Sequence, residues 1–170
     1  MGASRTASVA VTIALTLTLS ACWVEQRTDL EDRTPDPPTP NRQIIQPEGV
    51  ARLPVFSTAV RTGDLLFLSG QIGTLPGVSA PTLVEGGIAA ETRQTMENVV
   101  SVLEAAELGL GDLVKCTVFL ADIADYGSMN EVYLEFFPSD PPARSALAGS
   151  GLALGARVEI ECIAAFPNGG

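Results

Sequence analysis

The strongest restriction on the fold comes from the stretch between Ile88 and Leu108. Apolar residues recur there at helical spacing, and charged residues occupy the remaining positions. The apolar set is Met96, Val99, Val100, Leu103 and Ala106, and the charged set is Glu91, Arg93, Glu97 and Glu104. This pattern predicts an amphipathic helix of about five turns. Such a helix has to bury its apolar face against another element.

The segments around this helix predict the rest of an α+β fold. "FSTAVRTGDLLFLSGQIG" contains two apolar runs separated by Thr62-Gly63-Asp64, a hairpin signal. "LVKCTVFLAD" predicts another strand, and "DYGSMNEVYLEFF" predicts a shorter helix that ends before Pro138. Two further strands are expected over 142–149 and 156–166. The order β-β-α-β-α-β-β predicts one sheet with both helices on one face. Because no segment remains to cover the other face, we expect oligomerisation.

Residues 1–21 are predicted to be a signal peptide rather than part of the fold. Arg5 precedes an uncharged apolar run over 7–19 that is too short for an ordinary membrane span. The end of the run, "LSAC", resembles the bacterial lipobox, in which cleavage exposes a cysteine that becomes acylated. This predicts Cys22 as the lipidation site. The alternative is an uncleaved or ordinarily cleaved signal, in which Cys22 has no such role.

Residues 22–42 are predicted to be a tether that follows the lipidated cysteine. They contain four prolines and almost no aliphatic side chains, a composition that favours an extended spacer over a folded unit. At about 3.1 Å per residue, such a spacer holds a domain roughly 60 Å from its anchor. The folded domain is expected over 43–170, on the periplasmic side of a bacterial membrane. Trp23, where aspartate would favour inner-membrane retention, points to the outer membrane.

Composition excludes several classes of function. The 170 residues include no histidine, which removes Ser/His/Asp nucleophile systems and His-ligated zinc. The net charge of −10 would repel phosphate backbones, so nucleic acid is not expected as a partner. Acid–base chemistry is therefore left to carboxylates, the two tyrosines Tyr126 and Tyr133, lysine or water.

Two acidic residues share one face of the last predicted strand. Glu159 and Glu161 are two positions apart, so they project together, while Val158, Ile160 and Cys162 point the other way. Arg144 stands upstream among prolines, alanines and glycines. Residue types alone leave two interpretations open. One is a salt bridge between Arg144 and a glutamate, or two acids on a solvated edge. The other is a carboxylate-binding arginine with a water-activating glutamate.

The motifs "SGQ", "MNEVY", "PARS" and "VEIE", in this order, resemble the RidA (YjgF) family of enamine/imine deaminases. The likeness runs from about Val55 to Phe166 and so covers the whole predicted domain. It implies a chorismate-mutase-like sheet with two helices on one face. It also implies a homotrimer whose sheets form a central barrel, with three sites between subunits.

The resemblance implies roles for particular residues of this chain. Arg144 matches the arginine that holds the substrate carboxylate, and Glu159 matches the residue that orients the attacking water. Ser69 and Gly70 match a strand end that lines the pocket, and Asn130 matches a pocket asparagine.

Two pocket positions depart from the family pattern. Phe56 stands where the family usually has tyrosine, so a hydroxyl is missing, and Ala146 stands where some members have cysteine. The loss of a hydroxyl is expected to alter substrate choice or lower the rate. It removes neither the anchor nor the water activator.

The resemblance implies a hydrolase that converts 2-imino or 2-enamino acids into 2-oxo acids and ammonia. It implies no metal or organic cofactor. The alternative is a membrane-tethered module that binds small carboxylates in the same pocket without turnover. Some family members have been called ribonucleases or translation inhibitors, which the acidic balance and missing histidine weigh against here.

Two other features of the sequence say less about function. Gly149, Gly151 and Gly155 lack the spacing of a dinucleotide-binding loop and lead into a strand, so a plain loop is expected. Cys116 and Cys162 lie in predicted strands. An extracytoplasmic setting would allow a disulfide between them, but we expect separate buried thiols.

Overall fold

The described part of the computed structural model, residues 41–48, 50, 54–78 and 80–167, forms one mixed sheet with two helices. The strands are β1 (Arg42–Ile45), β2 (Ala59–Thr62), β3 (Leu65–Ile72), β4 (Leu113–Leu120), β5 (Ala143–Ala148) and β6 (Val158–Ala165). The helices are α2 (Gly87–Glu104) and α3 (Tyr126–Glu135), with 3-10 turns at Leu110–Asp112, Ile123–Asp125 and Ala153–Gly155. The α+β prediction is confirmed.

The six strands lie in the order β1-β2-β3-β6-β4-β5. All neighbouring pairs are antiparallel except β4 and β5, which run parallel. β2 and β3 form the predicted hairpin, and Gly63 in its turn has a φ of 57°, which glycine adopts without steric cost. The last strand in sequence, β6, thus lies in the middle of the sheet.

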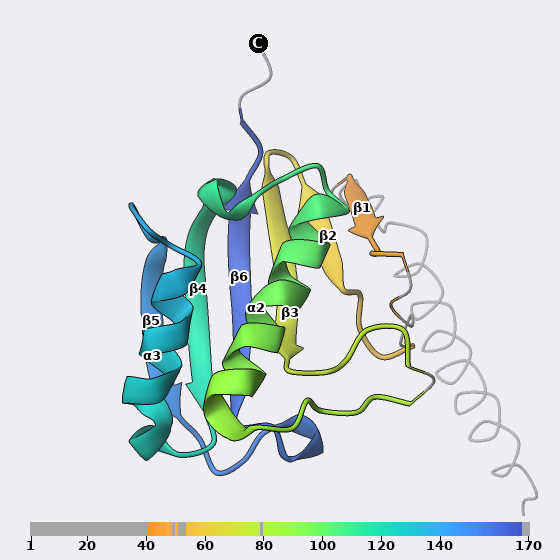
Figure 1. The fold of residues 1–170 in the computed structure, drawn as a ribbon. Helices are drawn as coiled ribbons and strands as arrows, with labels where there is room; N and C mark the ends of the chain where they lie inside the picture. The colour runs from red at the N-terminus through yellow and green to blue at the C-terminus, as the bar shows by residue number, and fades with distance from the viewer. Residues whose placement is uncertain (1–40, 49, 51–53, 79, 168–170) are drawn as a thin grey trace, which may run out of the picture. The chain divides into compact units, whose positions relative to one another are not determined.

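Both helices cover the same face of the sheet, α2 over β6 and β3 and α3 over β5 and β4 (Figure 1). The apolar residues of α2, among them Met96, Val99 and Leu103, are buried against the sheet as the sequence predicts. The charge of Glu91 suggested a solvent-facing position on the helix, but the structure places this residue in the interior. It is 6% exposed, and its Oε2 accepts a hydrogen bond of 2.8 Å from the backbone N–H of Arg157. This carboxylate therefore fixes the start of β6 to α2.

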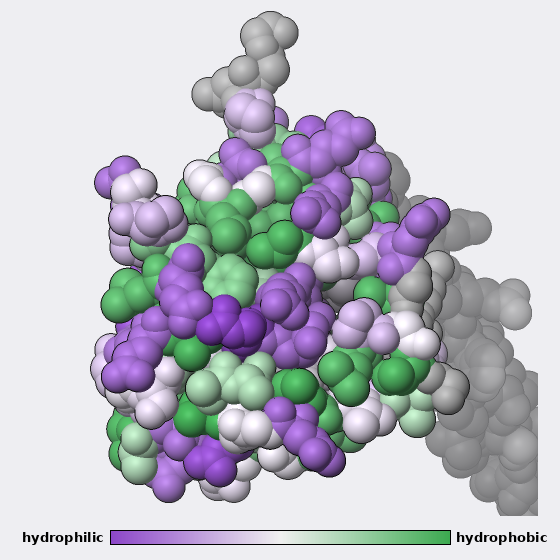
Figure 2. Space-filling view, in the orientation of Figure 1, coloured by the Kyte–Doolittle hydropathy of each residue, from purple (hydrophilic) through white to green (hydrophobic). Residues whose placement is uncertain are grey.

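A polar band crosses the outer side of the helical layer, between areas of hydrophobic side chains (Figure 2). Arg93 on α2 and Glu135 on α3 form an ion pair of 2.7 Å there. Figure 2 shows hydrophilic side chains gathered across the middle of this side. Such a surface is suited to water rather than to burial.

The opposite face of the sheet is open in a single chain and carries large apolar side chains. Leu65 is 39%, Phe67 42% and Leu147 46% exposed. In β6, alternate residues beginning with Val158 are buried under the helices, while Glu159 and Glu161 face the open side, as predicted. The open face is thus mainly apolar with a local pair of acids.

Local differences from the sequence prediction concern element ends. β1 was not expected as a strand, because its four residues are too few to show a period. α2 ends at Glu104 rather than continuing to Leu108, and the chain turns through Glu107, which has a φ of 59°. The segment with Gly149, Gly151 and Gly155 is a loop with a short 3-10 turn, as expected.

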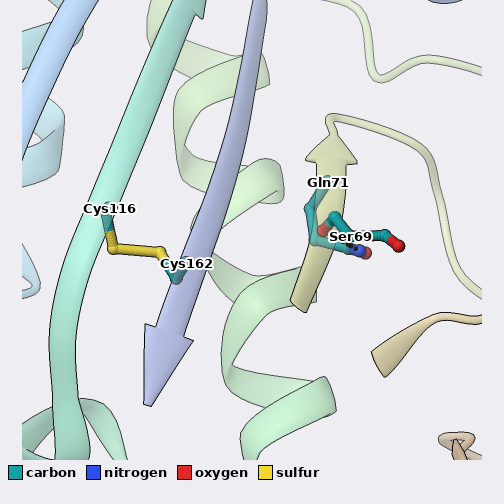
Figure 3. Close-up of a disulfide and its surroundings, with 4 residues drawn as sticks. All are labelled: Ser69, Gln71, Cys116 and Cys162. Carbon is teal, nitrogen blue, oxygen red and sulfur yellow. Dashed lines mark hydrogen bonds between the residues drawn. A yellow bond between two sulfur atoms is a disulfide. The ribbon is translucent and has the colours of Figure 1, made fainter. Parts of the chain in front are cut away.

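The expectation of separate thiols is wrong, because Cys116 and Cys162 form a disulfide (Figure 3). The two cysteines are direct partners in the antiparallel register of β4 and β6, and both point toward the helices. Directly opposed positions bring side chains on one face close together. The sequence places each cysteine in a strand but does not give the register between strands 46 residues apart.

The predicted signal peptide, the tether and Cys22 lie outside the described residues. Among the residues that the structure describes, no helix combines the length and the apolar character needed to cross a membrane.

Candidate functional site

Arg144 lies on the edge strand β5, on the face that the helices cover. Its register partner on β4 is Cys116, which points into the core, so Arg144 points to the same side. Its guanidinium carbon lies 4.7 Å from the ring centroid of Tyr133 and 5.9 Å from that of Tyr126, both on α3. Nη2 of Arg144 donates a hydrogen bond of 3.3 Å to the Tyr126 hydroxyl. Aromatic faces thus hold this cation.

No described carboxylate lies within ion-pair distance of Arg144. The ion pairs of the described residues join Arg93 to Glu135 and Arg157 to Asp125. The interpretation of a salt bridge between Arg144 and Glu159 or Glu161 is therefore wrong within a single chain. Its guanidinium keeps donors free for an anionic ligand.

The remaining predicted residues on this side lie close to Arg144 in the fold. Asn130 is one helical turn after Tyr126 on α3. Its hydrogen bonding, together with the positive charge and hydrogen bond of Arg144, lowers the pKa of Tyr126. Ala146 follows Arg144 on the same face of β5 and is half-buried against the core. We call Tyr126, Asn130, Arg144 and Ala146 the arginine group.

Tyr133 forms the floor beneath Arg144. It is 2% exposed, and its hydroxyl has no hydrogen-bond partner among the described residues. Burial raises the pKa of Tyr133, and the charge of Arg144 acts against this rise. Tyr133 is therefore a neutral aromatic support for the guanidinium.

Glu159 lies on β6, on the open face of the sheet. Burial, and secondarily repulsion from Glu161, raise the pKa of Glu159. Its side chain leans over Gly70 on β3, where an added Cβ would lie only 2.7 Å from Cδ of Glu159. A side chain at position 70 would therefore displace the Glu159 carboxylate.

Ser69 and Phe56 lie beside this strand end. The Ser69 hydroxyl donates a hydrogen bond of 2.7 Å to the Ser57 carbonyl, and the Ser69 N–H donates one of 3.0 Å to the Thr58 carbonyl. Phe56, next in the same loop, is 50% exposed. We call Phe56, Ser69, Gly70 and Glu159 the glutamate group.

Asn98 on α2 supports the glutamate group and was not singled out by the sequence. Its Nδ2 donates hydrogen bonds of 2.9 Å to the carbonyls of Ile72 and Thr74, which hold the end of β3. The signal in the sequence is an amide between two apolar helix positions, Met96 and Val99. That signal alone does not identify the strand that the amide contacts.

The two groups do not meet within one chain. Arg144 faces the helical side of the sheet and Glu159 the open side, and β4 separates their strands. The structure thus brings together the members of each group but not the two predicted catalytic residues. A site that uses both requires a second copy of the chain.

Among the described residues, no group of three or more acidic or cysteine side chains could hold a metal ion. The chemical inventory of the two groups is a guanidinium, a phenol, an amide, a hydroxyl and a carboxylate. These groups suffice to bind a small carboxylate and to move a proton to or from water.

Comparisons with known proteins identify the family of the chain. The family model described as Endoribonuclease L-PSP matches residues 49–166. A 2-iminobutanoate/2-iminopropanoate deaminase of Rattus norvegicus is 42% identical over 114 residues, which cover 67% of this chain and 82% of the relative. The crystal structure of RidA from the Antarctic bacterium Psychrobacter sp. has a TM-score of 0.67 at 36% identity, covering 73% of this chain and 99% of that one. E. coli TdcF with bound serine has a TM-score of 0.67 at 31% identity, covering 74% and 99%. The chain therefore belongs to the endoribonuclease L-PSP (RidA) family.

Proposed function

We propose that this protein is a hydrolytic deaminase that converts 2-imino and 2-enamino acids into 2-oxo acids and ammonia. The observation that carries the proposal is the free guanidinium of Arg144, which no described carboxylate neutralises and which rests on the aromatic floor of Tyr133. A cation held in this way is suited to the carboxylate that all these substrates share. Relatives at about 42% identity are named 2-iminobutanoate/2-iminopropanoate deaminase.

The proposed reaction adds water across a carbon–nitrogen double bond. Arg144 holds the substrate carboxylate and fixes the position of C2. Glu159 accepts a proton from water as the water oxygen bonds to C2, and it returns that proton to the imine nitrogen, which gives a carbinolamine. Glu159 then accepts the hydroxyl proton of the carbinolamine as the C–O double bond forms, and this second proton passes to nitrogen as the C–N bond breaks. Ammonia leaves and a 2-oxo acid remains. The raised pKa of Glu159 suits this role, because the same group must both take and return a proton.

We propose that each site forms between two copies of the chain in a homotrimer. The arginine group of one copy and the glutamate group of the next supply the two halves. Two observations support this assembly. Arg144 and Glu159 lie on opposite faces of the sheet, and the open face carries exposed apolar side chains such as Phe67 and Leu147. Trimers are typical of the family. We do not extend the nuclease activity in the family's name to this chain, because its net charge is −10 and it has no histidine.

The test is an assay of imine hydrolysis. A 2-imino acid is generated in solution by an amino-acid oxidase, and 2-oxo acid release is followed with and without the full-length protein. Arg144→Ala removes both the charge and the bidentate contact, so kcat/KM should fall at least about a hundredfold. Arg144→Lys keeps the charge but loses the planar fork and should also lose activity. Arg93→Ala, which removes an exposed arginine that belongs to neither group and pairs with Glu135, is the control.

A carboxylate-binding module without turnover predicts a different result. Wild type would then bind 2-oxo acids through Arg144 but leave the decay rate of the imino acid unchanged. That outcome would reject the deaminase.

We also propose that the protein is exported and lipid-anchored through Cys22. The "LSAC" motif supports this, and the Cys116–Cys162 disulfide fits an oxidising compartment. Wild type should enter the detergent phase of a detergent extraction, and Cys22→Ser should remain in the aqueous phase. Partition of wild type into the aqueous phase would reject the anchor.

A further inference from the structure

Tyr126, the first residue of α3, places a hydroxyl beside the guanidinium of Arg144. The Tyr126 oxygen lies 3.3 Å from Nη2 of Arg144. Its side chain is 40% exposed, in contrast to Tyr133, which is buried under the same guanidinium. Tyr126 is therefore the tyrosine of this cluster that a ligand can reach.

The hydrogen bonds of Tyr126 leave its own proton available. A guanidinium has donors but no acceptor, so the phenol oxygen accepts from Arg144. Hydrogen bonding by Asn130 and the charge and hydrogen bond of Arg144 both lower the pKa of Tyr126, which means that both favour the phenolate oxygen as an acceptor. Neither contact takes up the Tyr126 proton, because each favours the deprotonated oxygen. The hydroxyl is thus held in place by donors while its O–H remains free to donate.

The position of this O–H relative to Arg144 indicates what it contacts. A carboxylate docked on the free donors of Arg144 comes within hydrogen-bonding reach of a phenol that already contacts the same guanidinium. We propose that Tyr126 donates its hydroxyl proton to the ligand carboxylate held by Arg144 and so sets the affinity for 2-oxo and 2-imino acids. The ligand class in this proposal rests on the proposed function; the contact itself rests on the geometry at Arg144.

This contact is made equally to substrate and product, because both carry the carboxylate. It therefore contributes uniform binding rather than transition-state stabilisation. Its loss should raise KM and leave kcat nearly unchanged. A general destabilisation of α3 would instead lower the unfolding midpoint and the fraction of active protein.

The test compares Tyr126→Phe with wild type as full-length proteins. The substitution removes the hydroxyl and keeps the ring. Pyruvate and 2-oxobutanoate are the probes, with affinities measured by calorimetry, and imine hydrolysis gives KM and kcat. We expect the affinity for both 2-oxo acids to fall roughly tenfold, because a hydrogen bond to a charged group is lost. KM should rise by a similar factor, with kcat within about twofold of wild type.

Two further variants make the comparison specific. Ser128→Ala removes an exposed hydroxyl from the same turn of α3 and should leave affinity and unfolding midpoint unchanged. In an Arg144→Ala background, Tyr126→Phe should cost much less than in wild type, because the ligand carboxylate is no longer held beside the hydroxyl.

The outcomes separate this proposal from the proposed function. If wild type hydrolyses imines and Tyr126→Phe matches it in affinity and KM, the role of Tyr126 is rejected and the deaminase stands. If wild type binds 2-oxo acids without turnover, the deaminase is rejected, and a tenfold loss of affinity in Tyr126→Phe still supports the contact. If wild type binds no 2-oxo acid, both proposals are overturned.

Discussion

Glu159 can accept a proton only while its carboxyl group is ionised, so its environment sets the acid limit of the proposed reaction. Burial and the charge of Glu161 raise the pKa of Glu159. The carboxyl group is therefore protonated up to a higher pH than an ordinary glutamate, and kcat/KM should fall as pH drops through this raised pKa.

Glu161→Gln provides the test of this pH dependence. It removes the repulsive charge, so the pKa of Glu159 should move down and the acid limb of the kcat/KM profile should move to lower pH. Burial remains, so the shift is partial. At neutral pH the activity should change little, whereas Glu159→Gln should lower turnover by about 10² to 10⁴. Glu104→Gln, an exposed acid on α2, is the control. An acid limb that moves to higher pH in Glu161→Gln would contradict the assignment.

Gly70 gives a second prediction about the carboxylate. Gly70→Ala places a methyl group 2.7 Å from Cδ of Glu159, so the carboxylate has to move. A displacement of about 1 Å at a catalytic group costs roughly a hundredfold in rate, so kcat should fall by about that factor. Binding of 2-oxo acids should be less affected than kcat.

The control for this variant is Gly111→Ala, whose added Cβ meets no atom within 4 Å. Kinetic constants of Gly70→Ala equal to those of wild type would show that the position of Glu159 over Gly70 is unimportant for turnover.

At the scale of elements, β6 has two roles because its side chains alternate between the two faces of the sheet. Its buried residues, including Cys162, attach the strand to the helical core, and its open-face residues present Glu159. The disulfide from Cys162 to Cys116 fixes β6 against β4, the strand that also pairs with Arg144 on β5. One central strand thus connects the core to both candidate groups.

Reduction of this disulfide should destabilise the domain. The bond closes a loop with a sequence separation of 46 residues. A loop of this length restricts the unfolded chain by about 4 kcal/mol in the chain-entropy account, and measured losses are typically about 2 to 5 kcal/mol. We expect denaturant unfolding under reducing conditions to show a loss in this range. Cys116→Ala combined with Cys162→Ala should become insensitive to the reductant. Equal stability of wild type with and without reductant would contradict the contribution of the bond.

At the scale of the whole molecule, the site is expected to depend on assembly. The arginine group and the glutamate group occupy different faces of one sheet, and the open face exposes Leu65, Phe67 and Leu147. Burial of that face between copies would remove apolar surface from water and place the groups of neighbouring copies together.

Mixed assemblies test this dependence. Arg144→Ala and Glu159→Gln are each expected to be nearly inactive alone. In a cyclic trimer formed from equal amounts of both, about a quarter of the sites combine an intact arginine group with an intact glutamate group. Co-expression should therefore restore roughly a quarter of wild-type activity. Arg144→Ala mixed with itself is the control, and light scattering reports the mass. A monomer, or mixtures that stay inactive, would place the site within one chain.

Local sequence determined much of the architecture. The 3.6-residue period of α2, the alternation of β6 and the Thr62-Gly63-Asp64 turn are properties of contiguous residues. Each element was found where its pattern predicts it, although α2 ends four residues earlier than predicted. The shared face of Glu159 and Glu161 follows from the same alternation. Residue types singled out Arg144, Glu159 and Glu161 but left their role open. The assigned roles and the other pocket residues came from the resemblance of motifs, because periodicity marks a strand but does not mark which of its residues does chemistry.

Contacts between distant segments were decided only by the tertiary structure. The register of β4 against β6 pairs Cys116 with Cys162, the packing of α3 gives Arg144 an aromatic floor instead of a carboxylate, and the fold buries Glu91 against β6. It also sets Glu159 over Gly70. These contacts join residues far apart in the chain, and their geometry depends on how whole elements pack, which no local pattern of residue types encodes.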